Sequence, residues 1–137
     1  MRWAVCLAVF AATAGVLPAD PKDVAVRALD VTVESPAKGK ATEPTVIRSA
    51  DELAKAISDK AAVAAVKKAV DFDKEQVVYF AWAGSGQDQV TAAGSVGAKG
   101  LEVTFTYAPG RTRDLRTHAR LFAVPKGATY KVVTAGR

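Results

Sequence analysis

The chain has 137 residues, of which 50% are hydrophobic and 24% charged, and its formal net charge is +5. This length suits one domain with a modest core, and the composition excludes a disordered chain and a fibrous repeat. The charge is uneven, because residues 20–88 carry ten Lys or Arg against twelve Asp or Glu, whereas residues 89–137 carry eight against two. The basic excess is therefore local to the second part of the chain.

Residues 1–19 have the pattern of a secretory signal peptide. A positive start is followed by an apolar or small run over residues 3–14, and Ala12-Thr13-Ala14 fits a small-x-small cleavage site. A second candidate cut follows Leu17-Pro18-Ala19. The run is shorter than the roughly 20 apolar residues that cross a bilayer, so we expect no transmembrane anchor in the mature chain. We expect a periplasmic or secreted protein.

The single cysteine, Cys6, lies before either cut, so the mature chain is expected to lack cysteine. Such a chain has no disulfides, thiolate metal sites or cysteine nucleophiles, and it must rely on its hydrophobic core. Export also argues against a nucleic-acid target.

Residues 20–44 are predicted to be an exposed lead-in, with one candidate strand between residues 23 and 33. The domain itself is expected to span residues 45–137 and to begin with a short extended piece, Thr45-Val46-Ile47.

A helix is predicted to begin after Ser49. This serine can cap the helix, and Glu52, three residues on, can complete a capping box. Apolar residues at helical spacing extend the prediction to about Lys68, with a candidate break at Ser58-Asp59.

Residues 76–82 are predicted to form the central strand. They are β-branched and aromatic, and they lie between an acidic segment, residues 71–75, and the turn Gly84-Ser85-Gly86. Because apolar side chains occupy both parities, both faces of this strand should be covered.

The rest of the chain is predicted to form short strands joined by turns. Residues 97–100 should close one hairpin and Pro125-Lys126-Gly127 another. We therefore predict an α+β domain, in which one long helix packs on a curled antiparallel sheet of five to seven short strands. The strands of this part are expected at residues 89–96, 101–107, 118–124 and 129–133.

No catalytic, cofactor or metal site is predicted. Gly84-Ser85-Gly86-Gln87 lacks the third glycine of a phosphate-binding turn. Ser85 is not in a Gly-x-Ser-x-Gly nucleophile elbow, because Ala83 and Gln87 occupy the two outer glycine positions. The acidic segment at residues 71–75 lacks the glycine and the final glutamate of a calcium loop. His118 is the only histidine, which excludes a multi-histidine metal site.

Four arginines within ten residues are the strongest feature outside the core. Such a segment is either an ordinary solvated loop or a contact for an anion or an acidic partner. The predicted partner-binding residues are Arg111, Arg113, Arg116 and Arg120.

The chain resembles the PrcB C-terminal domain family over residues 46–133. The resemblance rests on the Asp-Phe entry to the strand in residues 70–78, the glycine turn, Pro109-Gly110, and Arg116-Thr117-His118 leading into residues 121–126. These are small exported bacterial domains, and the founding member stabilises a surface protease complex. The resemblance implies a non-catalytic, protein-binding role and supplies no catalytic residues.

Two functions remain open at this point. The first is an exported domain that binds or stabilises another envelope or secreted protein, a protease being one candidate. The second is an anion-binding module for acidic glycans or phosphate that uses residues 111–120. A small hydrolase would need a catalytic constellation that the sequence does not offer.

Overall fold

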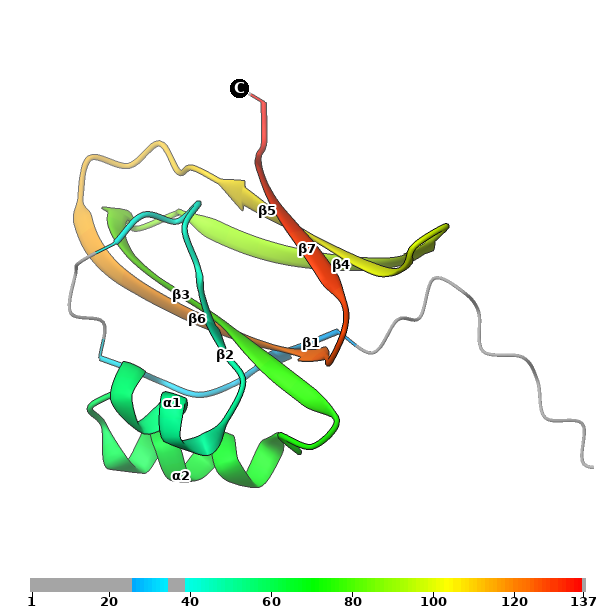
Figure 1. The fold of residues 1–137 in the computed structure, drawn as a ribbon. Coiled ribbons are helices and arrows are strands. Elements are labelled where there is room, and N and C mark those ends of the chain that lie inside the picture. The colour runs from blue at the N-terminus through cyan, green and yellow to red at the C-terminus, as the bar shows by residue number, and fades with distance from the viewer. Residues whose placement is uncertain (1–25, 35–38, 137) are drawn as a thin grey trace, which may run out of the picture.

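The computed structural model describes residues 26–34 and 39–136. They form two helices and seven strands in two sheets (Figure 1). One sheet has the strand order β1-β6-β3-β2 and the other β4-β5-β7. The elements are β1 (Arg27–Leu29), β2 (Thr45–Ile47), α1 (Ala50–Ala56), α2 (Lys60–Ala69), β3 (Glu75–Ser85), β4 (Gln89–Gly97), β5 (Gly100–Ala108), β6 (Leu115–Pro125) and β7 (Thr129–Thr134).

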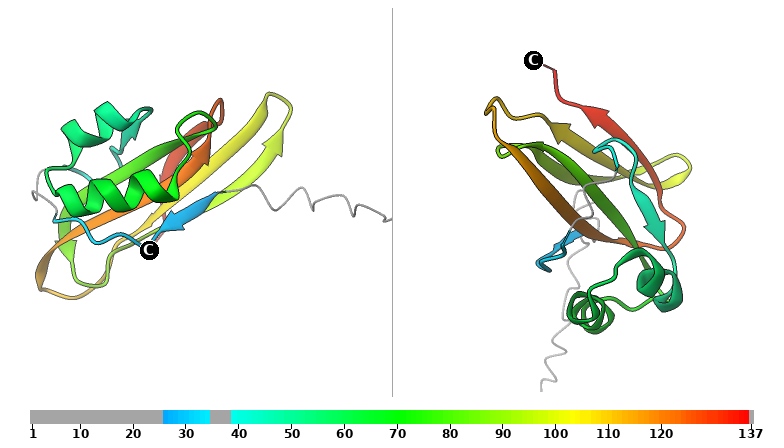
Figure 2. Two further views of the ribbon diagram at one scale, coloured as in Figure 1. Left: turned by 90° about the horizontal axis from the view of Figure 1, so that it is seen from below. Right: turned by 90° about the vertical axis from the view of Figure 1, so that its left-hand side faces the viewer.

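The elements stack in three layers, with the helices on one face of the four-stranded sheet and the three-stranded sheet on its other face (Figures 1 and 2). β3 runs through the middle of the four-stranded sheet. Its Val77 and Tyr79 side chains join the core under the helices, whereas Val78, Phe80 and Trp82 join the core between the sheets. The prediction of a central strand with both faces covered is confirmed, as is the α+β class.

The predicted long helix is in fact two helices. The Ser49 hydroxyl accepts a hydrogen bond from the Glu52 amide at 3.2 Å, which confirms Ser49 as the cap, and α1 begins after it. The Glu52 carboxylate accepts from the Arg48 amide at 2.7 Å, one residue before the Ser49 amide that a full capping box uses. α1 ends at Ala56, the next residue, Ile57, is extended, and the carboxylate of Asp59 caps the start of α2. The prediction of one long helix was wrong, whereas the candidate break at Ser58-Asp59 lies where the two helices separate. An aspartate that can accept hydrogen bonds from free amides starts a helix more readily than it continues one.

The predicted curled single sheet was also wrong, because the chain builds two sheets. β4 and β5 form the expected hairpin, but β6 and β7 do not pair. β3 pairs with one edge of β6. β1 pairs with the other edge at residues 121–123 of β6, where β7 would pair if the two strands formed a hairpin. After the turn at Gly127, whose φ is +83°, the chain crosses to the other sheet, and β7 lies parallel to β5.

The described part of the predicted lead-in contributes to the fold. β1 pairs antiparallel with β6, and both Val33 and Ala41 are buried. The predicted signal peptide lies outside the described residues, so it stays a prediction, together with the boundaries at residues 19 and 44.

Candidate partner-binding surface

A buried carboxylate holds the turn between β3 and β4. Asp88 is only 5% exposed. Its Oδ2 accepts hydrogen bonds from the Trp82 indole at 3.1 Å and the Tyr107 hydroxyl at 2.9 Å, and its Oδ1 accepts from the Gly110 amide at 2.7 Å. Because these donors lie on β3, on β5 and just after β5, Asp88 ties the two sheets to the segment that leads to the arginines.

These contacts also set the charge of Asp88. Burial by itself raises the pKa of this carboxyl group, but the hydrogen bonds from Gly110, Trp82 and Tyr107, with the charge of His118, outweigh it. The pKa is therefore lower than usual, and Asp88 is a buried anion at neutral pH. A buried charge of this kind is tolerated because several donors satisfy it.

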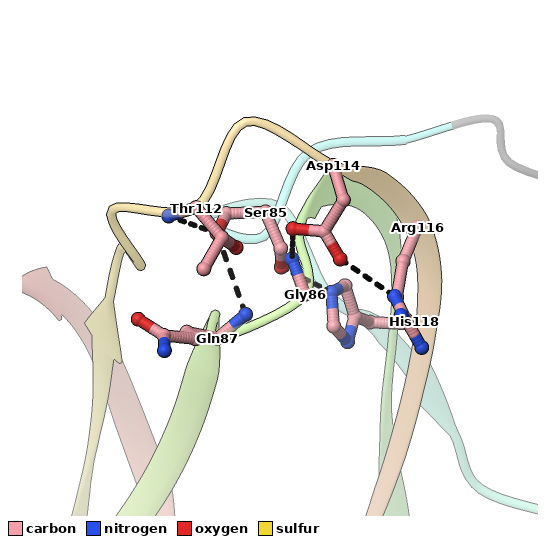
Figure 3. Close-up of polar contacts among 7 residues, drawn as sticks. All are labelled: Ser85, Gly86, Gln87, Thr112, Asp114, Arg116 and His118. Carbon is pink, nitrogen blue, oxygen red and sulfur yellow. Dashed lines mark hydrogen bonds and ion pairs between the residues drawn. The ribbon is translucent and has the colours of Figure 1, made fainter.

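We call residues 109–114, between β5 and β6, the arginine loop. Two side-chain clamps fix it to the turn at residues 85–87 (Figure 3). The Ser85 hydroxyl accepts from the Thr112 amide at 3.1 Å and contacts the Thr112 hydroxyl at 2.5 Å. The Asp114 carboxylate accepts from the Gly86 amide at 3.2 Å. Together with the Gly110–Asp88 bond, they hold the loop at its start, middle and end.

The four predicted arginines are all exposed, but they do not form one cluster. Arg111 and Arg113 lie on the arginine loop, whereas Arg116 and Arg120 lie on β6. Arg116 is already paired, because its Nε donates to Asp114 at 2.7 Å (Figure 3). Within residues 26–34 and 39–136, the other three arginines form no ion pair.

Arg120 lies in a different place from the arginine loop. It is four residues beyond Arg116 on the same face of β6, roughly 13 Å away at the usual strand rise. There it lines a polar groove of about 240 Å³ between β6 and residues 29–33, together with Asp30 and His118. The basic surface thus consists of Arg111 and Arg113, with Arg120 separate.

The carboxyl group of Asp114, which forms the second clamp, ionises more readily than usual. Hydrogen bonds from the side chains of Thr112 and Arg116 and from the Gly86 amide hold the pKa of Asp114 well below its usual range. The carboxylate is therefore charged at neutral pH, where it accepts the hydrogen bond from the Gly86 amide.

His118 is a structural residue in this geometry. Its Nε2 lies 2.7 Å from the Ser85 carbonyl oxygen, which only accepts, so Nε2 carries a hydrogen (Figure 3). Its ring stacks on Trp82 with the centroids 4.9 Å apart. Since His118 bonds the Ser85 carbonyl and not its hydroxyl, the two do not form a nucleophile and base pair. In the described part of the chain no group of His, Cys, Asp or Glu is arranged to hold a metal.

An apolar side chain stands exposed beside the arginines. Leu115 is the first residue of β6, directly after the arginine loop, and is 81% exposed. An isolated exposed leucine needs no explanation, but one at the end of a fixed basic loop adds an apolar contact to it. The surface therefore offers both charge and apolar area.

Sequence reasoning identified the arginines but missed the residues that position them. Asp88, Asp114 and Ser85 each hold a backbone amide of a neighbouring segment. Their one sequence signal is position, since short polar side chains next to glycines in turns commonly bond the backbone. That signal indicates a local turn, and it does not reveal bonds across more than twenty residues.

The chain matches no known protein-family model, and no significant similarity to a curated protein or to a solved structure was found. Neither helix of the described residues is long and apolar enough to cross a membrane.

Proposed function

We propose that this protein is an exported, non-catalytic domain that binds an acidic surface of another envelope or secreted protein through the arginine loop. The observation that carries the proposal is that Arg111 and Arg113 stand exposed on a loop whose backbone is fixed by hydrogen bonds. A loop that only connects two strands gains nothing from two like charges so close together. An acidic partner offsets their repulsion by pairing with the guanidinium groups.

Fixing the loop before binding favours affinity. Ordering flexible side chains and loops opposes association, by about 0.5–1.5 kcal/mol for each immobilised long side chain. Here Ser85, Asp88 and Asp114 order the loop backbone in the free protein. Only the arginine side chains remain to be ordered when the partner arrives.

Leu115 favours a protein partner over a small anion. A phosphate or an acidic glycan pairs with arginine but gains little from a leucine that is 81% exposed. A protein surface can cover this side chain and pair with the arginines at the same time. The resemblance to the PrcB C-terminal domain family supports the same choice, and it makes a protease complex one candidate partner. An anion-binding module remains the alternative.

A pull-down from the protein's own envelope fraction identifies the partner, and binding is then measured with a double variant. Arg111→Gln with Arg113→Gln removes the two unpaired charges and spares Arg116, which holds Asp114. The matched control, Lys99→Gln with Lys126→Gln, removes the same charge from two exposed turns elsewhere. We expect the first variant to bind more slowly, with the largest effect at low salt, and the control to bind like the parent.

Leu115→Ala separates the two functions. We expect it to weaken a protein complex by accelerating dissociation, whereas binding of phosphate or an acidic glycan should not change. If the double arginine variant and its lysine control bind the partner equally well, the arginine loop is not the contact. If phosphate or a sulfated glycan binds and no protein is recovered, the anion-binding alternative replaces the proposal.

A further inference from the structure

β4 is a long strand with an unprotected edge. It is hydrogen-bonded to β5 alone, and its other edge has no strand partner among the described residues (Figure 2). Natural sheets protect such edges by charged residues, proline or short length. The other described edge strands follow this rule, since β1 and β2 have three residues each and β7 carries Lys131. β4 has nine residues, and residues 89–98 contain neither a charge nor a proline.

The sequence of β4 is also close to a palindrome. Residues 90–96 read Val-Thr-Ala-Ala-Gly-Ser-Val, with Ala93 at the centre. If two copies of β4 lie antiparallel about a two-fold axis at Ala93, each residue meets one of similar kind. Val90 faces Val96, Thr91 faces Ser95, and Ala92 faces Gly94.

Burial gives this pairing an energetic reason. Val96 is 63% exposed, whereas Val90 is 6% exposed and belongs to the core between the sheets. These two residues lie on the same face of β4. In the symmetric pairing, Val96 of each copy lies against Val90 of the other and extends that core. On the opposite face, Thr91 and Ser95 of the two copies come within reach of a hydroxyl hydrogen bond.

We propose that two copies of this protein pair antiparallel through β4 and form a continuous six-stranded sheet with a two-fold axis at Ala93. The pairing is isologous, so it closes after two copies and does not build a fibre. The chain carries a net charge of +5, but this edge carries none, so charge does not oppose close approach there. One added strand pair buries a small area, so a dissociation constant of about 1 μM to 1 mM is expected.

Sedimentation equilibrium tests the proposal. The protein is expressed from its full sequence in a host that can remove a signal peptide. We expect a reversible dimer, and we expect Ala93→Lys to weaken it at least about fivefold, because two lysines would meet on the axis. Val133→Lys is the matched control, since it adds the same charge to an exposed position of β7, the opposite edge of the sheet. It should leave the dissociation constant unchanged. Circular dichroism checks that both variants are folded.

Disulfide cross-linking tests the register in which the two β4 strands pair, and it does not depend on measuring a dissociation constant. In a Cys6→Ser background, Ala93→Cys should oxidise to a disulfide-linked dimer, since residue 93 meets its own copy. Thr91→Cys should not link to itself, but it should link to Ser95→Cys when the two variants are mixed. A monomer at all concentrations overturns the proposal. So does a dimer that Ala93→Lys and Val133→Lys affect equally, or a Thr91→Cys dimer that forms as readily as the Ala93→Cys dimer.

Discussion

Replacing Asp88 by asparagine tests whether this carboxylate is the main polar link between the two sheets. The two side chains have the same shape, but asparagine has one acceptor oxygen where aspartate has two. If that oxygen faces the Gly110 amide, the NH₂ group meets the indole N–H of Trp82, and in the opposite orientation it meets the Gly110 amide. In either case a buried N–H group loses its acceptor.

The expected loss is about 2–4 kcal/mol. An orphaned buried donor costs about 1–3 kcal/mol, and each remaining bond loses roughly 1 kcal/mol when its acceptor is no longer charged. Urea unfolding at pH 7, followed by the fluorescence of Trp82, measures the change. Asp73→Asn is the control, because Asp73 is exposed and its carboxylate holds no such network, and it should stay within about 0.5 kcal/mol of the parent. A loss below about 1 kcal/mol for Asp88→Asn would refute the reasoning.

The pH dependence of the free energy of unfolding, compared between the parent and Asp88→Asn, adds a second test. The pKa of Asp88 in the folded protein lies below its usual value of 3.8. Its ionised form therefore stabilises the fold above about pH 4, and this contribution is lost as the pH falls through the folded pKa. The difference in stability between parent and Asp88→Asn should be largest at neutral pH and should shrink below pH 4. A difference that stays constant across this range would show that charge is not the cause.

Three further substitutions test other parts of the structure. Trp82→Ala should lower the free energy of unfolding by about 3–5 kcal/mol in urea, because Trp82 is buried and stacked on His118; a loss below about 1 kcal/mol would contradict this. Tyr79→Phe should leave stability unchanged or raise it by about 1 kcal/mol, because the buried Tyr79 hydroxyl has no hydrogen-bond partner among the described residues. A less stable Phe variant would show that this hydroxyl is bonded. Asp114→Asn should accelerate hydrogen exchange of the Gly86 amide, because it weakens the bond that this amide donates. Ser95→Ala is the control, and equal exchange rates in the two variants would exclude the Asp114 clamp.

The elements that local sequence decides were predicted well. The β3 strand, the helix cap at Ser49 and the β4–β5 hairpin each depend on patterns within about ten residues, and all three are confirmed. The errors concern choices between distant partners. Pro125-Lys126-Gly127 predicts a turn correctly, but a turn does not decide whether the next strand joins β6 or the other sheet. That choice depends on β1, which already occupies the edge of β6.

The same limit applies to the surface proposed for binding. The arginines are visible in the sequence because charge is a property of single residues. Their rigidity is not visible, because it depends on Asp88 and Ser85 bonding segments that are 22 and 27 residues away. A solvated loop and a binding loop can therefore have the same composition. In this protein the amides of Gly110 and Thr112 are held by Asp88 and Ser85 before any partner binds. The proposal of a binding role for the arginine loop therefore rests on these two bonds more than on the charge count.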